Sequence, residues 1–471
     1  MLALDLMILV PLAAAVLAAA AGSRARLVAL AAVVAQGALL ASVASGTLSE
    51  TALTGAMTGT PFALALDGLA APLVALTVFV GLTAVSASWR VDDAPGRHFA
   101  LLLILQAALA AVFMAADIVL FYVAWEAALV PMFLLIGGWG SGNARRAATK
   151  FLVYTFAGGA VLLAGVIYAV ALSGTTVIAE MTVGQQGIAQ TLAFWLLAVG
   201  FLVKLPAVPV HTWLPDAHTE APTAGSIVLA GVLLKMGGYG LIRIAAPVAP
   251  DGFAAAAPVL LALGVVGIVW GAATALVQTD LKRLVAYSSV AHMGFVLLAI
   301  GVGTPESLSA AVVTMVSHGL VAGMLFFLVG ALYHRTHTRE LVAFGGLGSV
   351  APRWSVAFVF ACLASAGLPG LSGFPGEFVS ILTALPLLGA WVLVAGIGIV
   401  LAAAYNLRAV RSTVQGPVGQ TSDPGDLDAR ETATSALFAV AVVALGVAPW
   451  IVTEWAASAL AALATAVSGG V

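Results

Sequence analysis

The sequence has little charge: Asp, Glu, Lys and Arg make up 8% of its 471 residues, whereas hydrophobic residues make up 62% and the mean hydropathy is +1.13. Soluble domains contain about 25% charged residues. The single cysteine, Cys362, excludes a disulfide framework and an iron–sulfur cluster held by cysteines. This composition predicts an integral membrane protein with almost no soluble domain.

Nucleotide and redox motifs are also missing. There is no phosphate loop, no dinucleotide fingerprint in a strand–turn–helix context and no bis-histidine haem pattern. The run GGYG at 237–240 falls in an apolar segment, where glycines indicate close helix packing. The first segment lacks the basic leading region of a signal peptide and contains Asp5 instead. We therefore expect a chain that neither carries electrons nor binds a nucleotide, but moves something else.

Apolar segments of spanning length, about 20 residues, recur along the whole chain. The pattern predicts an all-α membrane protein with about fourteen transmembrane helices. The predicted spans are 2–21, 27–46, 64–88, 98–115, 117–136, 149–172, 191–215, 219–246, 254–278, 281–302, 306–333, 354–387, 390–410 and 433–464.

The distribution of basic residues supports this arrangement. Of the 18 Lys and Arg, only Lys204, Lys235 and Arg243 fall within or at the end of predicted spans. All the others lie in or beside odd-numbered loops, and a wrong number of spans would scramble that pattern. By the positive-inside rule, the odd loops are cytoplasmic and both termini lie on the opposite side.

Two of the predicted spans, the seventh and the twelfth, are broken by prolines. Their breaks read VKLPAVPVHTWLP and AGLPGLSGFPGEF. They are five spans apart, so a repeat of that length would be inverted in the membrane, an architecture found in many ion-coupled transporters. The predicted organisation is a three-helix segment (1–97), a first inverted repeat (98–246), a second inverted repeat (247–411), and a cytoplasmic loop with a last helix (412–471).

Three ionisable residues lie deep in the first repeat. Lys204 and Lys235 are too deep for their ammonium groups to reach an interface, and a charge at the bilayer centre costs about 2.5–3.5 kcal/mol even on the lenient insertion scale. Glu126 lies near the middle of the fifth span. It could be a structural carboxylate satisfied by a lysine of a neighbouring helix, but intramembrane carboxylates are usually functional. We predict that Glu126 and Lys204 form a pair that loads and releases a proton, with Lys235 as a relay.

Three further residues in the second repeat are candidates. His292 and His318 are lone histidines in apolar segments, which suits a buried hydrogen-bonded histidine as well as a proton shuttle. Glu377 follows Gly376 in the broken twelfth span and is predicted to be the proton site nearest the far side.

Other polar residues have simpler interpretations. Helix caps or anchors at span ends account for Asp67, Asp117, Asp280, Lys282 and Arg283. Near the cytoplasmic end of the broken seventh span, loop hydrogen bonding and proton entry are equally plausible for His211, Asp216, His218 and Glu220. The two histidines of this group are seven residues apart with a proline between them, and no metal site is predicted.

Several segments, among them FYVAWEAALVPMFLLIGGWG, KFLVYTFAG and GLPGLSGFPGEF, resemble the antiporter-like membrane subunits of respiratory complex I, the NADH–quinone oxidoreductase. The resemblance runs from about residue 60 to 435, and it is carried by FYVAWEAALVPMFLLIGGWG, KFLVYTFAG, LVAYSSVAHMGF, MVSHGLVAGMLFFLVGALYHRTHTREL, GLPGLSGFPGEF and the stretch from Val203 to Arg243. HTWLPDAHTEAPTAGS and LYHRTHTREL favour the M type, equivalent to the fourth mitochondrially encoded membrane subunit. An L-type chain would continue into a long lateral helix, which is absent here.

The resemblance implies a proton channel along the membrane midplane. Glu126 matches the fifth-helix glutamate, Lys204 its seventh-helix lysine partner and Lys235 the central eighth-helix lysine. His292 and His318 match connecting relay residues, and Glu377 matches the twelfth-helix glutamate. Many relatives have an asparagine before that glutamate, where this chain reads LSGFPGEF. The resemblance therefore does not define the proton exit route near Glu377.

The resemblance also implies a setting. No cofactor or metal is expected in this chain, whereas NADH, FMN, iron–sulfur clusters and quinone are expected in partner subunits. The implied partners are the L-type and N-type membrane subunits and, through them, a peripheral arm, in a bacterial cell membrane; no nucleic acid is involved. The alternatives are a subunit of a multisubunit sodium/proton antiporter, or a membrane arm of a hydrogenase or of a complex fed by another donor. A scaffold is disfavoured, because it would need no such charges at membrane depth.

Overall fold

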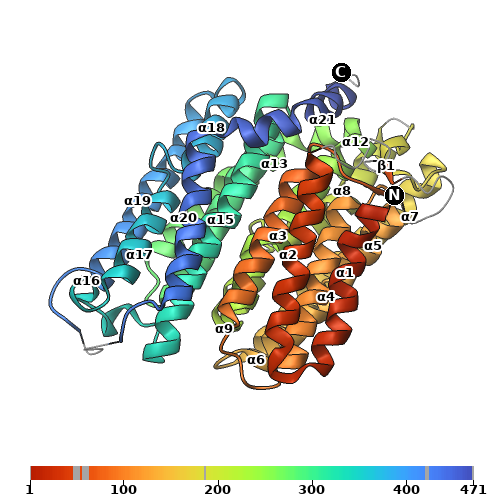
Figure 1. The fold of residues 1–471 in the computed structure, drawn as a ribbon. Coiled ribbons are helices and arrows are strands. Elements are labelled where there is room, and N and C mark those ends of the chain that lie inside the picture. The colour runs from red at the N-terminus through yellow and green to blue at the C-terminus, as the bar shows by residue number, and fades with distance from the viewer. Residues whose placement is uncertain (1, 46–53, 56–62, 185–186, 420–423, 469–471) are drawn as a thin grey trace. The chain divides into compact units, whose positions relative to one another are not determined.

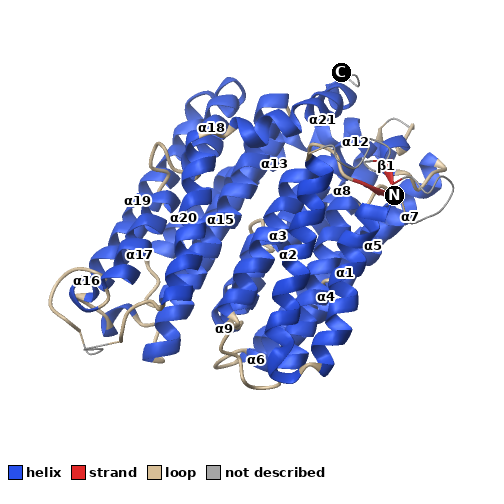
Figure 2. Ribbon diagram, in the orientation of Figure 1, coloured by secondary structure: helices blue, strands red, loops and turns tan. Residues whose placement is uncertain are grey.

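The computed structural model describes residues 2–45, 54–55, 63–184, 187–419 and 424–468, and the regular structure of these residues is almost entirely helical (Figure 2). One short antiparallel pair, β1 (Thr54–Gly55) with β2 (Leu64–Ala65), is the only sheet among them. In the described residues, 12 helical segments are long and apolar enough to cross a membrane, and α8 (Ile188–Lys204) and α17 (Pro352–Ser365) are shorter apolar helices. The predicted fold class, an all-α integral membrane protein, is confirmed.

The chain folds into two compact units. Unit 1 comprises Met1–Leu205, Val232–Ala257 and Glu454–Val471, and unit 2 comprises Pro206–Gly231 and Pro258–Thr453. The repeat boundaries inferred from the sequence remain a prediction.

Unit 1 begins with four helices that pack against one another: α1 (Leu2–Ala20), α2 (Ala25–Ala44), α3 (Ala70–Ala87) and α4 (Pro95–Met114) (Figure 1). The short η1 (Gly22–Arg24) joins the first two, and η3 (Ile178–Glu180) lies before α8. The long α7 (Ala144–Ser173) packs against α8. A Cβ atom on Gly200 of α8 would lie 2.7 Å from the Gly158 carbonyl oxygen of α7. The glycine therefore permits the close approach of these two backbones.

The fifth span is interrupted beside one of the candidate residues. It consists of α5 (Ile118–Ala127) and α6 (Leu129–Trp139), with Ala128 between them. Pro131 has no amide hydrogen to donate to the carbonyl of Ala127, one turn earlier, so the helix is weakened at this point. Glu126 lies immediately before the interruption.

The eighth span is continuous but contains two wider, π-helical turns. It runs through α10 (Thr223–Val228), α11 (Leu234–Gly240) and α12 (Ala246–Val248), joined by the π-helical turns η4 (Leu229–Leu233) and η5 (Leu241–Ala245). Single π-helical turns occur frequently at functional sites. Lys235 is the second residue after the first of them.

Unit 2 is built around two buried helices, α14 (Leu281–Val302) and α15 (Pro305–Thr336), which pack against each other and against α18 (Gly373–Leu388). α19 (Val392–Thr413) packs on α14, α17 and α18, and α20 (Ala429–Val447) packs on α15 and α17. An apolar cluster that includes Phe295 and Leu298 fills the contact of α14 with α18 and α19. The remaining elements are α9 (Trp213–Glu220), η6 (Leu341–Ala343), α16 (Leu347–Val350) and η7 (Gly389–Trp391). The helix α13 (Pro250–Leu276) begins in unit 1 and continues into unit 2.

Both predicted breaks are present. The seventh span stops at Lys204, the last residue of α8, and helix resumes only at α9. The twelfth consists of α17 and α18, separated by residues 366–372.

The single span predicted for 433–464 is wrong. Helix α20 ends at Val447, and a separate helix, α21 (Trp450–Ser468), follows. The boundary has a local cause: Pro449 disfavours helical backbone at the residue before it, and Ala448 has φ −126° and ψ 60°.

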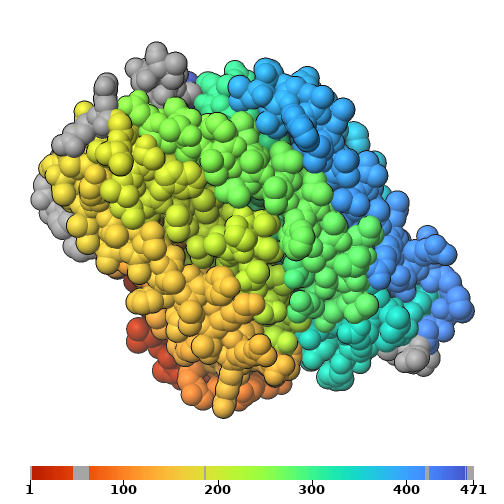
Figure 3. Space-filling view, turned by 180° about the vertical axis from the view of Figure 1, so that it is seen from behind, coloured from red at the N-terminus to blue at the C-terminus, as the bar shows by residue number. Residues whose placement is uncertain are grey.

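Large apolar side chains are exposed along several helices. On α7, which belongs to the segment coloured orange to yellow in Figure 3, Val153 is 59%, Phe156 61% and Ile167 61% exposed. A soluble monomer rarely exposes so much apolar surface, and a bilayer or neighbouring membrane helices would cover it.

Candidate functional site

The first group of candidate residues lies in unit 1 around Glu126. Its carboxylate is half-buried, and Tyr122, one helical turn earlier on α5, interacts with it through its hydroxyl group. The oxygen Oε1 of Glu126 is buried and has no hydrogen-bond partner in the described residues. This carboxylate is therefore only partly satisfied by its surroundings.

Lys204 is almost completely buried, at 1% exposure, and interacts electrostatically with Glu126. No hydrogen bond joins the two, and within the described residues Lys204 Nζ has no hydrogen-bond partner at all. Instead Nζ lies 5.0 Å from the centre of the Trp125 ring, at cation–π distance. The ammonium group is thus held by an aromatic face and by a nearby charge rather than by a fixed ion pair.

A glycine on α7 makes room for the Glu126 side chain. A Cβ atom on Gly159 would overlap Oε1 of Glu126. Only glycine leaves this space free, so α7 helps to determine where the carboxylate lies.

Lys235 lies in α11 and is completely buried. The helix that carries it packs against α8, because Gly237 lets the backbone approach Phe201 and Leu205. This burial is consistent with the position inside the helix bundle that the sequence predicts for Lys235. The role predicted for the residue remains a prediction.

The second group lies in unit 2, around the break of the twelfth span. His292 of α14 and Glu377 of α18 are buried, and Nδ1 of His292 lies 2.5 Å from Oε1 of Glu377. On the other side of the ring, Nε2 of His292 lies 3.3 Å from Oγ of Ser365, the last residue of α17. The histidine therefore contacts both halves of the broken span.

His318 of α15 lies beside this pair. Its ring centre is 5.6 Å from that of His292. A cavity of about 10 Å³ lies among these side chains and is also lined by Ser288, Ser317 and Glu377. That volume is close to the minimum for one water molecule. The structure therefore brings His292, His318 and Glu377 together around one small polar cavity.

Sequence reasoning missed the polar side chains that surround His292. Tyr405 Oη lies 3.4 Å from Nε2 of His292, and Asn406 Nδ2 donates to Ser365 Oγ at 3.2 Å. Both residues lie in α19 and are buried. The sequence does place a polar tyrosine–asparagine pair within an apolar segment, which indicates buried polar contacts. Only the packing of α19 shows that these contacts are with His292 and Ser365.

The polar residues at span ends have the predicted structural roles. Asp117 caps α5 by accepting hydrogen bonds from the amides of Val119 and Leu120, and Asp280 caps α14 in the same way. Asp67 accepts from two amides at the start of α3 and pairs with Arg243 at 2.5 Å. These contacts satisfy the helix-terminal amides described for such caps.

The residues near the broken seventh span are held by similar contacts. Asp216 of α9 lies 3.4 Å from Nη1 of Arg283, and Lys282 donates to the carbonyl oxygen of Ala221. The His218 ring stacks on Phe326 with 4.4 Å between ring centres. In the described residues, no group of three or more His, Cys, Asp or Glu side chains lies close enough to hold a metal ion.

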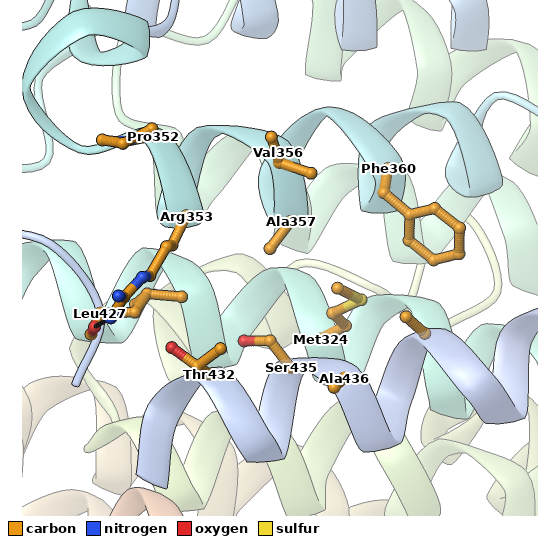
Figure 4. Close-up of a pocket in the computed structure, with 11 residues that line it drawn as sticks. Met324, Pro352, Arg353, Val356, Ala357, Phe360, Leu427, Thr432, Ser435 and Ala436 are labelled. Atoms are coloured by element: carbon orange, nitrogen blue, oxygen red, sulfur yellow. Dashed lines mark hydrogen bonds between the residues drawn. The ribbon is translucent and has the colours of Figure 1, made fainter. Parts of the chain in front are cut away.

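A larger hollow of about 500 Å³ lies on unit 2, where α17, α20 and α15 meet (Figure 4). Figure 4 shows Arg353 at one end and Phe360 at the other, with Ser435 and Met324 between them. Its lining is largely apolar and contains none of the candidate residues. It is therefore distinct from the small polar cavity at His292.

Comparison with known proteins identifies the family. The family model for the NADH:quinone oxidoreductase/Mrp antiporter transmembrane region matches residues 115–402. NADH-quinone oxidoreductase subunit M of Rhodobacter capsulatus is 40% identical over 410 residues, covering 83% of this chain and 80% of that protein.

Solved structures have the same fold. A chain of respiratory complex I from Thermus thermophilus matches with a TM-score of 0.89 and 30% identity, over 98% of this chain and 99% of that one. A chain of the Mrp complex from Dietzia sp. matches with a TM-score of 0.88 at 22% identity, over 99% of each chain, which shows a shared fold. The chain thus belongs to the NADH:quinone oxidoreductase/Mrp antiporter transmembrane family.

Proposed function

We propose that this chain is a proton-translocating membrane subunit of an NADH–quinone oxidoreductase. Its redox partners would oxidise NADH and reduce a quinone, with NADH, FMN, iron–sulfur clusters and quinone bound in those partners. The similarity to a relative named subunit M, and to a chain of complex I at 30% identity, supports this proposal.

We propose for this chain the setting that the sequence resemblance implies. The chain would lie in a bacterial cell membrane, beside L-type and N-type subunits and joined through them to a peripheral arm. By the positive-inside pattern, both termini would lie on the non-cytoplasmic side.

The observation that carries the proposal is the environment of Lys204. A buried ammonium without a hydrogen-bond partner, above Trp125 and near Glu126, has no structural purpose that a leucine would not serve better. Electrostatic interactions are strong in a low-dielectric interior. A change in charge beside Glu126 would therefore alter the proton occupancy of Lys204, and in this way the pair could load and release a proton.

The His292 group supplies a second place where a proton can be held. Imidazole has a donor and an acceptor nitrogen and titrates near neutral pH. With Glu377 on one nitrogen and Ser365 on the other, His292 can accept a proton at one atom and release it from the other. We propose that His318 exchanges protons with His292, and that Lys235 serves the first group in the same way.

The first test is to tag the chain in its native host, purify it gently, and identify the proteins that accompany it while NADH–quinone activity is measured. An NADH-oxidising peripheral arm with iron–sulfur subunits would support the proposal. Small hydrophobic subunits alone, with sodium-dependent proton movement and no redox activity, would refute it and assign the chain to the antiporters.

The second test is to replace Lys204 with Ala and Glu126 with Gln in the assembled complex. Proton pumping by membrane vesicles should fall strongly while assembly is retained. Glu306→Gln is a matched control, because Glu306 is exposed at the start of α15. Normal pumping and quinone reduction in the Lys204 and Glu126 variants would exclude this pair from the mechanism.

A further inference from the structure

Unit 1 has a groove at helix ends that lie next to its basic loops. It is lined by the end of α1, the start of α4, the end of α6 and the start of α7, and its volume is about 690 Å³. This is within the range of about 300–1,000 Å³ for small-molecule pockets. None of the proposed proton-transfer residues lines it.

Two arginines lie at this groove. Arg97, in the first turn of α4, and Arg145, in the first turn of α7, both line it and are both exposed. Neither guanidinium group has an ion pair or a hydrogen bond in the described part of the chain. The fork of a guanidinium group matches the geometry of a phosphate, so two unpaired arginines lining one groove favour an anionic ligand.

The surrounding charge has the same sign. The chain segments that lead into and out of these helix ends, 21–27, 88–97 and 139–150, contain seven basic residues and only two acidic ones, Asp92 and Asp93. The basic residues are Arg24, Arg26, Arg90, Arg97, Arg145, Arg146 and Lys150. The positive-inside pattern places all three segments in cytoplasmic loops.

The rest of the groove is apolar and includes an aromatic residue suited to an interface. Leu101, Phe133 and Leu134 line it, and Leu134 is 43% exposed. Trp139 also lines it, and its indole Nε1 donates to the Asp93 carbonyl oxygen at 2.8 Å. Tryptophan is enriched at the level of lipid headgroups. The groove thus combines cationic groups with an apolar wall beside a membrane interface.

We propose that this groove binds one anionic phospholipid of the cytoplasmic leaflet. Its phosphate would lie at Arg97 and Arg145, and an acyl chain would follow Leu101, Phe133 and Leu134. Basic pockets between transmembrane helices on the cytoplasmic side bind anionic headgroups in this way. The proposal does not depend on the proposed proton-transfer function.

The hollow on unit 2 also contains an arginine, but its positive charge is offset by a carboxylate. Its arginine, Arg353, donates to the Leu427 carbonyl oxygen and interacts with the Asp426 carboxylate. That carboxylate offsets the positive charge, so the hollow has little preference for an anion. At the unit 1 groove, no carboxylate of the described residues forms an ion pair with either arginine.

The first test measures lipid retention by the purified, assembled complex. The complex is stripped with detergent, incubated with phosphatidylglycerol or phosphatidylcholine, washed, and analysed by mass spectrometry for bound lipid. The variant Arg97→Gln with Arg145→Gln should bind phosphatidylglycerol at this site about 30-fold more weakly, from the attraction of two arginines to an anionic lipid. One phosphatidylglycerol per complex should be lost, and phosphatidylcholine binding should not change.

Arg146→Gln is the matched control, because Arg146 is adjacent and exposed but does not line the groove. Equal loss of lipid in this control would show a general effect of surface charge and would overturn the proposal. Unchanged retention of phosphatidylglycerol in the double variant would overturn it as well.

A second test needs no variant and therefore does not depend on assembly. The wild-type complex is labelled with a photoactivatable phosphatidylglycerol, or with the phosphatidylcholine analogue, and the labelled peptides are mapped. We expect labelling of 97–101 and 133–139 by the anionic probe, reduced at high salt because exposed charges are screened. Equal labelling by both probes, or labelling only elsewhere, would contradict the proposal.

Discussion

Nδ1 of His292 lies 2.5 Å from Oε1 of Glu377, although the two residues are 85 positions apart in the sequence. Their side chains are only 9% and 8% exposed. This buried contact joins two candidate residues that were predicted separately, because the sequence does not show that they meet. It also joins α14 to the half of the broken span that follows the break.

Replacing Glu377 with Gln should reduce proton pumping at least about tenfold, since positioned acid–base groups contribute about 10²–10⁴-fold where proton transfer limits the rate. The amide keeps a hydrogen bond to His292 but cannot take up a proton. The measurement is vesicle acidification driven by NADH in membranes that contain the assembled complex. Asp251→Asn is a control at a residue outside the cavity lining; equal loss in both variants would argue against a specific role for Glu377.

Gly159→Ala should impair activity nearly as much as Glu126→Gln, because the added methyl group overlaps Oε1 of Glu126 and must displace the carboxylate. Helical propensity alone would favour alanine by about 0.5–1 kcal/mol. Gly396→Ala, in a helix where the new methyl group meets nothing within 4 Å, is the control. Pumping and thermal stability should be measured for both variants. A fully active Gly159→Ala complex would show that the position of Glu126 is not critical.

Arg335→Leu should destabilise unit 2 by about 1–3 kcal/mol, the cost of lost hydrogen bonds to a buried charged group, because Glu431 keeps its contacts with Arg430 and with the Asp428 amide. Arg335 forms two contacts with Glu431, at 3.2 and 2.5 Å, and the Glu431 side chain is only 5% exposed. Replacing both residues with Leu should restore part of that loss, because neither charge of the pair then stays buried, although the contact of Glu431 with the Asp428 amide is also removed. Thermal unfolding of the purified protein measures each variant. Equal stability of the single and double variants would contradict this account.

Lowering the pH should release the segment around Asp426 from the start of α17. Burial opposes ionisation of this carboxyl group, but hydrogen bonds from the amides of Arg353, Trp354 and Leu427, together with the charge of Arg353, outweigh it and lower the pKa of Asp426. Because the folded-state pKa is below the unfolded value of about 3.9, the stabilisation is present above that value and is lost as the pH falls through the folded-state pKa.

Hydrogen exchange at the three donor amides, measured as a function of pH, checks this prediction. Their protection, corrected for the intrinsic exchange rate, should decrease below about pH 4, near the unfolded-state pKa of an aspartate. In Asp426→Asn the protection should be weaker and should not change with pH in this range. Protection in the wild type that stays constant with falling pH would refute the assigned role of the carboxylate.

The sequence by itself determined the membrane class, both broken spans and the burial of Lys204, Lys235, His292, His318 and Glu377. Hydropathy, proline positions and the rarity of charge are local properties that can be read along the chain. The caps formed by Asp117 and Asp280 were predictable for the same reason, since each acts on amides within three residues of itself. Pro131 and Pro449 mark two further helix interruptions, which long apolar segments do not reveal because proline itself leaves the hydropathy of a segment high.

Only the tertiary structure decided which distant residues meet. The approach of Tyr405, Asn406 and Ser365 to His292, and the space that Gly159 leaves for Glu126, depend on how helices far apart in sequence pack. Helical periodicity can show that one face of a helix is buried. It does not identify the neighbouring helix that covers that face, least of all in a helix that is apolar on every side. The position of Lys204 over Trp125, without a fixed ion pair, is likewise a result of packing that no pattern of residue types specified.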